Sequence, residues 1–296
     1  ICDRENEIKS FVPEEYWTIT ADYGDNFNAS LSKYNGEDIR ITKAEEADTI
    51  EKQLSAGRFV VESVKTGKRK PKPYAPFTTS SLQQDASIKL NFQTKKTMQI
   101  AQQLYEGIDV KGIGTRGLIT YLRTDSVRIS SAAKEAASEF IANKFGKEYC
   151  SNNSFSNKNK DIQDAHEAIR PTDINLEPEA IRDSLTSDQF KLYTLVWNRF
   201  VASQMSAAEF DTVTVTIDNN GYEFRTSGSR LVFDGWRRVY PIANDKDSYV
   251  PELKKGDELN CIELIKEQKF TQPPARYTEA GLVKEMEEKN IGRPST

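Results

Sequence analysis

The spacing of hydrophobic residues changes twice along this chain of 296 residues, and this change constrains the fold more than any other feature. Residues 12–77 and 206–270 carry apolar and β-branched residues in the alternation typical of half-buried strands. Between them, residues 78–205 carry apolar residues three and four positions apart, as amphipathic helices do. Two β-rich segments that flank a helical insert predict an α+β, multidomain chain whose β-rich domain is discontinuous in sequence.

Turn residues bound the expected strands. The sequence Asn219-Asn220-Gly221 is suited to a tight turn and joins two alternating segments into a hairpin. Residues 65–76 are basic and contain three prolines, which forbid regular structure and mark a domain boundary. The expected strands lie at residues 15–23, 58–65, 212–217, 222–226 and 258–264.

Capping patterns place several helices. A capping box at Thr42-Lys43-Ala44-Glu45 predicts a helix that runs to about Ala56 and ends at Gly57. A second capping box begins at Thr186 and predicts a helix that runs to about Gln204. Residues 151–160 are rich in Asn, Ser and Lys and are expected to be a disordered loop.

A further helix is expected to begin after Ser130 as its N-cap and to stop at Gly146. Its apolar residues recur at helical spacing and predict one buried face. That face is expected to contain Ala133, Ala136, Ala137, Phe140 and Ile141.

Composition excludes several classes of protein. Lys and Arg number 41 against 45 Asp and Glu, so the chain lacks the broad basic surface of a stand-alone nucleic-acid binder. Cations are concentrated locally, with six in residues 58–72 and four in residues 111–128, each against one carboxylate. The three cysteines are far apart in sequence and form no Cys-x-x-Cys pair, so neither a disulfide framework nor a zinc site is predicted. No apolar run is long enough to cross a membrane.

The chain begins at Ile1 and ends directly after Gly292-Arg293-Pro294-Ser295. We expect both ends to be internal to a longer protein.

The segment from Gly117 to Ser126 contains a tyrosine, Tyr121, with an arginine two residues later, Arg123. A phenol has a pKa of about 10 and attacks usefully only where cations and donors stabilise the phenolate. In an extended segment these two side chains project to the same side, and an arginine can form paired hydrogen bonds to phosphate oxygens. The pair suggests phosphoryl transfer. A half-buried tyrosine beside a surface arginine is the simpler alternative.

His166, the only histidine of the chain, lies in the segment from Asp164 to Thr172. A protonated imidazole donates a charged hydrogen bond to a phosphate and can assist proton transfer at a leaving oxygen. The alternative is a surface histidine on a short helix that Pro171 ends. A metal site is not predicted here, because there is no second histidine and no cysteine at ligand spacing.

The third candidate segment covers residues 272–296. Two prolines break the chain before a helix that is expected to open near Thr278. Exposed N–H groups at a helix start can bind phosphate, and hydroxyl and guanidinium groups add further donors. A helix that only packs is the alternative. The added donors after this helix are Arg293, Ser295 and Thr296.

These three segments occur in the order found in type IA DNA topoisomerases, and the chain resembles the bacterial topoisomerase I branch of that family. Residues 120–126 resemble its active-site tyrosine motif, residues 166–172 its histidine motif, and residues 273–296 its segment ending in Gly-Arg-Pro-Ser-Thr. Leu122 stands where topoisomerase III usually has proline. Shorter similarities lie at residues 59–63 and 76–86.

The resemblance implies roles for individual residues. Tyr121 would attack a backbone phosphate of single-stranded DNA, form a 5′-phosphotyrosine link and free a 3′-hydroxyl. Arg123 would bind the scissile phosphate, and His166 would assist positioning or charge near it. The DNA-binding residues implied are Arg123, Arg170, Arg293, Ser295 and Thr296.

The resemblance also implies the activity, which is ATP-independent relaxation of negatively supercoiled DNA by cleavage, strand passage and religation. In the family, the tyrosine works opposite an N-terminal domain that binds Mg²⁺ through an acidic cluster, and no segment here has that pattern. We therefore expect Mg²⁺ to be bound by that missing domain, no cofactor in this chain, and no activity of the 296 residues alone. The expected partners are single-stranded and negatively supercoiled DNA and the missing domain. We expect a monomer in the bacterial cytoplasm, associated with the nucleoid and not with a membrane.

The resemblance divides the chain into five segments. Residues 12–77 and 206–270 would form a β-rich arch, and residues 78–205 a helical domain that carries Tyr121. Residues 1–11 and 271–296 would be the fringes of a further helical domain that holds single-stranded DNA.

Two other functions remain open from the sequence. A non-enzymatic clamp module would contact DNA or protein through the basic stretch and would not need Tyr121. A tyrosine recombinase is disfavoured, because its histidine precedes the nucleophile, whereas His166 follows Tyr121.

Overall fold

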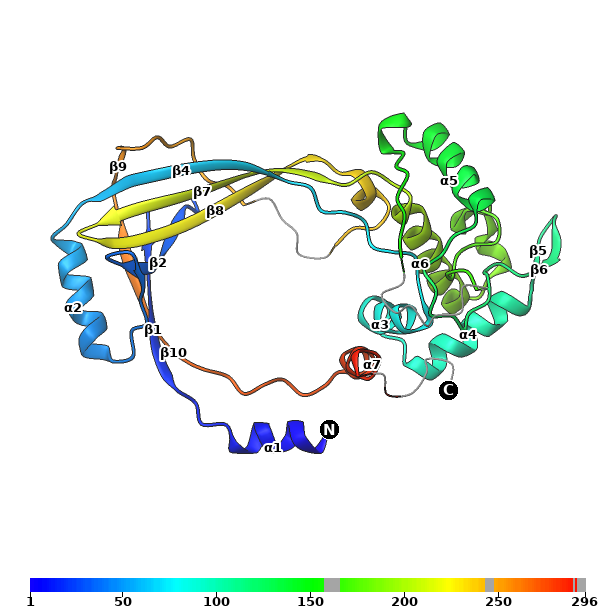
Figure 1. The fold of residues 1–296 in the computed structure, drawn as a ribbon, viewed down its shortest axis with the longest axis horizontal. Helices are drawn as coiled ribbons and strands as arrows, with labels where there is room; N and C mark the ends of the chain where they lie inside the picture. The colour runs from blue at the N-terminus through cyan, green and yellow to red at the C-terminus, as the bar shows by residue number, and fades with distance from the viewer. Residues whose placement is uncertain (157–165, 243–247, 290, 292–296) are drawn as a thin grey trace. The chain divides into compact units, whose positions relative to one another are not determined.

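The computed structural model describes residues 1–156, 166–242, 248–289 and 291 (Figure 1). They form two compact units. Unit 1 contains the described residues within 1–70, 209–233 and 244–276, and unit 2 contains those within 71–208, 234–243 and 277–296. In the described part of the chain, no helix has the length and apolar character needed to cross a membrane.

Unit 1 is built on an antiparallel sheet. Its described strands follow the order β10-β1-β2-β8-β7-β4-β9, with β3 paired to β2. Figure 1 shows β4, β7 and β8 running side by side as long ribbons. The strands are β1 (Glu15–Asp22), β2 (Asn28–Tyr34), β3 (Glu37–Asp38), β4 (Phe59–Arg69), β7 (Glu209–Asn219), β8 (Tyr222–Phe233), β9 (Glu258–Leu259) and β10 (Glu263–Phe270).

The predicted hairpin is confirmed as β7 and β8. Asn219 pairs with Tyr222, and the two residues between them have positive φ angles of 56° at Asn220 and 82° at Gly221. Two successive positive φ values define the turn that matches the twist of a hairpin, and asparagine followed by glycine adopts it most readily. A Cβ on Gly221 would also lie 2.5 Å from Asn35 Oδ1, so the Asn35 side chain would have to move.

The prediction of a single strand at residues 258–264 is wrong, because the chain forms two separate strands there, β9 and β10, which pair with different partners. β9 pairs with β4, whereas β10 pairs with β1. These partners lie near opposite ends of the strand order, yet four residues lead from Leu259 to Glu263, a reach of about 14 Å. The sheet is therefore curled so that its two ends come close together.

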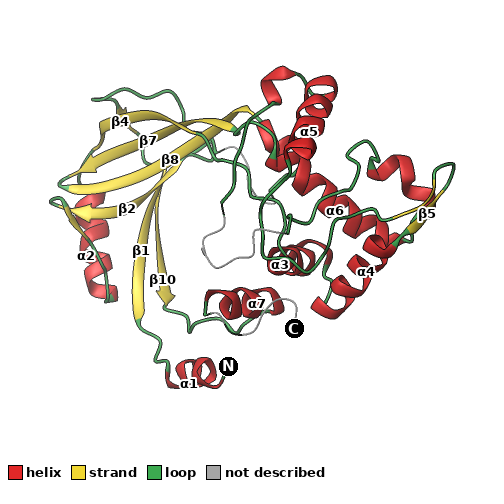
Figure 2. Ribbon diagram, turned by 45° about the vertical axis from the view of Figure 1, so that its right-hand side comes forward, coloured by secondary structure: helices red, strands yellow, loops and turns green. Residues whose placement is uncertain are grey.

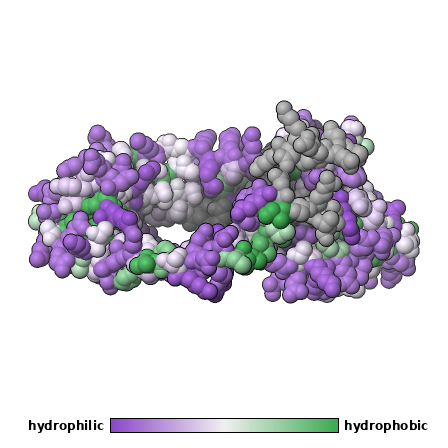
Figure 3. Space-filling model, turned by 60° about the horizontal axis from the view of Figure 1, so that its bottom comes forward, coloured by the Kyte–Doolittle hydropathy of each residue, from purple (hydrophilic) through white to green (hydrophobic). Residues whose placement is uncertain are grey.

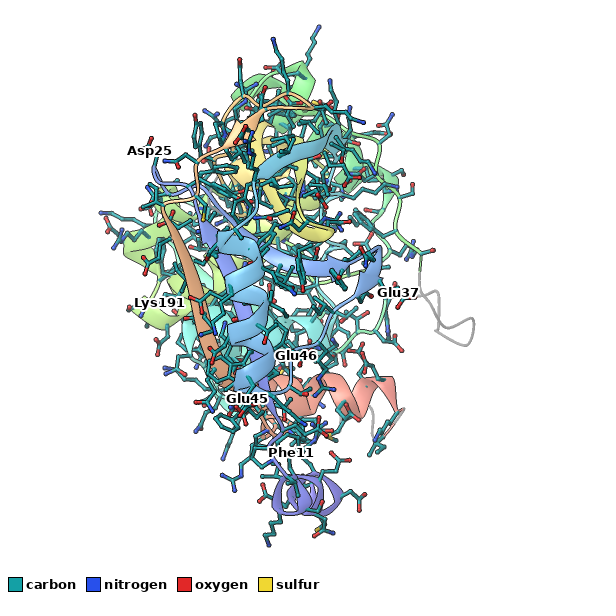
Figure 4. All side chains as sticks on the ribbon, turned by 90° about the vertical axis from the view of Figure 1, so that its left-hand side faces the viewer. Phe11, Asp25, Glu37, Glu45, Glu46 and Lys191 are labelled. Atoms are coloured by element: carbon teal, nitrogen blue, oxygen red, sulfur yellow. The ribbon has the colours of Figure 1, made fainter. Side chains whose placement is uncertain are left out.

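Helix α2 (Ala44–Ser55) packs on one face of this sheet, and α1 (Cys2–Ser10) begins the chain. The predicted capping box at Thr42 is wrong. The N-cap is Lys43, which makes no side-chain cap, and the backbone N–H of Thr42 instead donates to the Glu46 carboxylate at 3.2 Å. The helix begins one residue later than the box requires, so Glu46 rather than Glu45 reaches back. Figure 4 labels both glutamates on the first turn of α2.

The hydrophobic core of unit 1 lies between α2 and the sheet. Lys266 of β10 reinforces the packing through ion pairs to Asp48 and Glu51 of α2. Gly57, just after α2, is required for space, because a Cβ there would lie 1.9 Å from the side-chain oxygen of the buried Asn219. The core contains Ile19, Ala21, Phe27, Ala29, Ile41, Ala47, Ile50, Leu54, Phe59, Val61, Val215, Ile217, Tyr222 and Phe224.

The basic stretch is only partly irregular. Strand β4 continues to Arg69 and pairs with β7 along its length, so residues 65–69 form a strand, contrary to the prediction. The three prolines all lie beyond this point, and residues 70–76 have no regular structure. The hydrogen-bonding partner for residues 65–69 is β7, which lies far away in sequence.

Unit 2 is mainly helical, as Figure 2 shows. A small hairpin, which the sequence did not indicate, lies between its second and third helices. The elements are α3 (Thr79–Leu90), α4 (Thr94–Glu106), β5 (Ile108–Val110), β6 (Gly114–Arg116), α5 (Ser131–Lys144), α6 (Ser187–Ser203), α7 (Glu279–Glu288) and the 3₁₀ turns η1 (Lys147–Tyr149), η2 (Pro178–Ser184) and η3 (Gly235–Arg238).

Three predicted helix starts in unit 2 are confirmed. Ser130, Thr186 and Thr278 cap α5, α6 and α7, each by accepting a hydrogen bond from a backbone N–H of the first turn. The predicted inner face of α5 is too wide, because Ala137 and Ile141 are its only buried residues.

An arginine is buried in the core of unit 2. Arg199 of α6 donates through Nε to the Ala75 carbonyl at 2.6 Å and through Nη1 to Asp85 at 3.3 Å. Its guanidinium also lies 4.7 Å from the ring centroids of Tyr74 and Phe77. This one side chain therefore links α6, α3 and the proline-rich segment.

The mixture of helices with a curled antiparallel sheet agrees with the predicted α+β class. The five predicted domain segments stay a prediction, and part of the expected disordered loop, residues 157–160, lies outside the described residues. Figure 3 shows hydrophilic residues over most of one face of the molecule, with the hydrophobic ones in small groups.

Candidate active site

The segment that carries Tyr121 is irregular, with bends at Thr120, Leu122 and Arg123, and it alternates in exposure. Tyr121 is 42% exposed and Arg123 is also exposed, whereas Leu122 and Thr124 are buried at 1% and 4%. The two candidate side chains are therefore both exposed, although the bends mean that the segment is not the regular extended one on which the spacing argument relied.

One side of this segment is held by the histidine segment. Ile119 forms an isolated bridge with Pro171, and Thr120 N donates to the Arg170 carbonyl at 2.9 Å. The hydroxyl of Thr120 donates to the Ala168 carbonyl at 2.7 Å and accepts from Arg170 N at 3.0 Å. Residues 166–172 are thus extended along the tyrosine segment, and the alternative of a short helix there is wrong.

The other side of the tyrosine segment is held by the start of α3. Thr79 is fully buried, and its Oγ1 donates to the Leu122 carbonyl at 2.7 Å. The same hydroxyl accepts from Thr124 N at 2.9 Å, while Thr79 N donates to the Thr124 carbonyl. These bonds fix the backbone directly after Tyr121.

Two aromatic rings flank the ring of Tyr121. The ring centroid of His166 lies 5.6 Å away, with an interplanar angle of 54°. The ring of Tyr105, at the end of α4, also lies 5.6 Å away, in an edge-to-face arrangement of 68°. Such arrangements are the favoured ones for aromatic pairs and restrict the rotation of the ring. The phenol is thus held in place while a large part of it stays exposed.

Glu167 links the histidine segment to two other groups. Its carboxylate accepts from Ser130 N at 2.6 Å and from the Arg170 guanidinium at 2.6 and 3.1 Å. Partial burial by itself would raise the pKa of Glu167, but the hydrogen bonds from Ser130 and Arg170 outweigh it and lower that pKa. The carboxylate therefore stays ionised and anchors this segment to the start of α5.

Of the predicted DNA-binding residues, some lie within the described part of the chain and others lie outside it. The guanidinium of Arg170 is engaged by Glu167 and by the Pro171 carbonyl, so its described contacts are internal, and a contact with DNA stays a prediction. Arg293, Ser295 and Thr296 lie outside the described residues. Helix α7, which precedes them, packs on α3 through Glu287, whose carboxylate accepts from Ser80 Oγ at 2.6 Å.

Sequence reasoning missed the residues that position the site. Tyr105 lies outside the recognised segments, and Thr79 lies in the similarity at residues 76–86, but nothing in the sequence linked either residue to Tyr121. Thr120 and Glu167 lie inside the motifs that were recognised, so their presence was visible but their partners were not.

The described residues contain no group of three or more His, Cys, Asp or Glu side chains that could hold a metal ion.

Comparison with known proteins identifies the family. The DNA topoisomerase family profile matches residues 1–296. The full-length topoisomerase I structure from Thermotoga maritima matches with a TM-score of 0.86 at 40% sequence identity, over 100% of this chain and 47% of that protein. The present chain thus spans about half the length of this relative. With the tyrosine and histidine segments side by side in a fold shared with that enzyme, the chain belongs to the bacterial type IA DNA topoisomerases and corresponds to a part of topoisomerase I.

Proposed function

We propose that this chain supplies the nucleophile with which a type IA topoisomerase cleaves one DNA strand and relaxes negatively supercoiled DNA without ATP. The observation that carries the proposal is the exposed phenol of Tyr121, in contact with the rings of Tyr105 and His166 and close in the chain to the exposed Arg123. A nucleophile must reach its substrate and yet be oriented, and this arrangement meets both requirements.

The chemistry follows from these groups. The Tyr121 oxygen attacks a backbone phosphorus, an O–P bond forms to the tyrosine, and the bond from phosphorus to the 3′-oxygen breaks. The phenol proton is lost, and the leaving oxygen takes up a proton to become a 3′-hydroxyl. Arg123 offsets charge on the phosphate oxygens, and His166 adds a hydrogen bond or positive charge near the leaving group. The link conserves the energy of the broken ester, so religation needs no ATP.

The remaining expectations belong to the same proposal. The substrates are single-stranded and negatively supercoiled DNA, and the protein acts as a monomer in the bacterial cytoplasm at the nucleoid. Mg²⁺ is contributed by a domain outside these 296 residues, in the half of the relative's length that this chain does not match. The 296 residues alone are inactive.

The second candidate is a clamp module that binds DNA or protein without chemistry. The basic residues of β4 favour binding, but binding alone gives no reason for an exposed phenol held between two rings. The two candidates therefore differ in whether Tyr121 becomes covalently attached to DNA.

A trapping experiment separates them. The chain is mixed with the part of a topoisomerase I that it does not cover, a labelled single-stranded oligonucleotide and Mg²⁺, and the mixture is quenched with denaturant. We expect a covalent adduct joined through the 5′ end of the DNA with the native chain and none with Tyr121→Phe.

Tyr249→Phe is the matched control, because this tyrosine of unit 1 is 69% exposed and lies outside the candidate site. It should form the adduct normally. An adduct that persists with Tyr121→Phe would show a different nucleophile. No adduct from parts that demonstrably associate would favour the clamp module.

A further inference from the structure

Strands β4, β7 and β8 form a ribbon with two different faces. Residues paired across neighbouring antiparallel strands point to the same face of the sheet. The register therefore defines four rows of three residues on one face of the ribbon, and we name this face the ribbon face. The rows are Ser63, Thr216 and Arg225, then Lys65, Thr214 and Ser227, then Gly67, Thr212 and Ser229, and finally Arg69, Phe210 and Leu231.

The opposite face of the ribbon is covered where it meets the core, whereas Lys68 and Arg230 farther along it are exposed. Val215 and Ile217 point into the core beneath α2. At Gly228, on the same side as these residues, a Cβ would lie 2.7 Å from the Ser248 carbonyl oxygen and 2.9 Å from Val250. The core and Val250 therefore lie against part of this side, while Ser248 pairs with Ser229 along the edge of β8. The ribbon face is the other one.

The ribbon face has an unusual composition for this chain. Its twelve positions hold six Ser or Thr, three cations and no carboxylate, although acidic residues outnumber basic ones in the whole sequence by 45 to 41. All three cations, Lys65, Arg69 and Arg225, are exposed. The row nearest the hairpin turn, Asp218 with Glu223, is acidic and ends the patch.

Asp211, which lies between the last two rows, points away from them. Asp211 lies one position from the ribbon face and pairs on the opposite side with Arg230 at 3.3 Å. Arg69 lies with its guanidinium 4.3 Å from the ring centroid of Phe210, which keeps its charge on the ribbon face. A preference of threonine for strands explains the hydroxyls, but it does not explain cations without carboxylates.

This chemistry suits the backbone of a nucleic acid. Serine and threonine hydroxyls donate to phosphate oxygens, and lysine and arginine neutralise the phosphate charge. Successive rows are two residues apart, or about 6.8 Å, so the four rows span about 20 Å. Phe210 in the last row is buried, and the short hydroxyl side chains of the other rows offer little to distinguish one base from another.

We propose that the ribbon face is a DNA-binding surface that contacts the phosphodiester backbone without reading sequence. The proposal rests on the proposed function for its choice of DNA as the partner. It adds a DNA contact in unit 1, whereas Tyr121 belongs to unit 2.

The test compares two double variants of the 296-residue chain that remove the same charge from opposite faces. Lys65→Gln with Arg225→Gln acts on the ribbon face. Lys68→Gln with Arg230→Gln acts on the same two strands from the other side. Binding of a fluorescent single-stranded oligonucleotide is followed by anisotropy at several salt concentrations.

For single strands, log K falls with log salt by about 0.7 for each phosphate neutralised. We expect the ribbon-face variant to reduce this slope by about 1.4 and the control variant to leave it nearly unchanged. Equal slopes for both variants, or an unchanged slope for the ribbon-face variant, would overturn the proposal.

A second pair of substitutions tests the hydroxyls. Thr212→Val with Thr214→Val keeps the shape and strand preference of the side chains and removes two donors. We expect binding to weaken by about threefold to tenfold with the salt slope unchanged. Undiminished binding would exclude the hydroxyls from the surface. Circular dichroism verifies that the sheet is intact in the threonine variant. If the sheet is disrupted, the charge variants alone test the ribbon face.

The fate of this proposal is separable from that of the catalytic one. A covalent adduct through Tyr121, with binding that ignores the ribbon-face substitutions, would leave the topoisomerase function standing and overturn the ribbon face. If binding depends on the ribbon face but no adduct forms, the ribbon-face proposal would stand and the catalytic proposal would be overturned.

Discussion

The ring of His166 lies 5.6 Å from the ring of Tyr121, at an angle of 54° between their planes. The two residues are far apart in sequence, and the hydrogen bonds of Thr120 to the carbonyls of Ala168 and Arg170 bring their segments together. The imidazole thus has a fixed place beside the candidate nucleophile.

Replacement of His166 by Gln should reduce adduct formation by about tenfold to a hundredfold, because a hydrogen bond or charge near the leaving oxygen is lost while Tyr121 remains. The measurement is the rate of adduct formation in the trapping experiment. Lys191→Gln, an exposed substitution on α6, serves as the control and should leave the rate unchanged. A native rate with His166→Gln would remove the histidine from the mechanism.

Replacement of Glu167 by Gln should change how stability depends on pH. The pKa of Glu167 is lowered below its ordinary value of 4.5 in the folded chain, despite partial burial, by hydrogen bonds from Ser130 and Arg170. Its contribution to the free energy of unfolding is therefore present above about pH 4.5 and is lost as the pH falls through the lowered value.

Urea unfolding at a series of pH values measures this effect. The Glu167→Gln variant should be less stable at pH 7 by about 1–2 kcal/mol and should lose less stability than the native chain between about pH 5 and pH 3. Glu258→Gln removes an exposed carboxylate 3.5 Å from Arg58 and should change neither quantity noticeably. Parallel pH profiles for native and Glu167→Gln chains would contradict the assignment.

Replacement of Gly117 by Ala should displace the backbone at the start of the segment that carries Tyr121. A Cβ at this position would lie 2.5 Å from the carbonyl oxygen of Tyr105, and a backbone atom cannot give way easily. We expect a loss of stability of about 1–3 kcal/mol together with slower adduct formation. Gly112→Ala, in the nearby hairpin, meets no atom within 4 Å but also has a positive φ of 78°. Its loss of stability should come from the backbone alone, with no effect on the adduct.

Replacement of Arg199 by Leu should destabilise unit 2 by about 3–5 kcal/mol, because it removes a buried cation from Asp85 and from the Ala75 carbonyl. The free energy of unfolding from urea titration is the measurement. Arg182→Leu removes an exposed arginine paired with Glu179 and should cost less than about 1 kcal/mol. Similar losses for the two variants would show that the buried network contributes little.

Much of the local structure follows from short patterns in the sequence. Asn220 and Gly221 define the hairpin because few other residues accept two successive positive φ angles. Ser130, Thr186 and Thr278 begin their helices because a hydroxyl satisfies backbone donors next to it in the chain. The capping box predicted at Thr42 was wrong for an equally local reason, because a shift of one residue in the helix start decides whether Glu45 or Glu46 reaches back.

Longer-range features escaped these patterns. The two strands at residues 258–270 and the extension of β4 to Arg69 depend on pairing partners that local sequence does not identify. The ribbon face likewise depends on register, since a shift of one residue in any ladder would move its cations to the opposite face.

The sequence by itself determined the type of most elements, the identity of the tyrosine and histidine segments, and the family to which their order points. The tertiary structure alone decided that Tyr105 and His166 flank Tyr121, that Thr79 fixes the backbone behind it, and that Arg170 is engaged by Glu167. The physical reason is the range of the interactions. Caps and turns are satisfied by neighbours in the chain, whereas ring contacts and buried hydrogen bonds need partners that only the packed chain brings within a few ångströms.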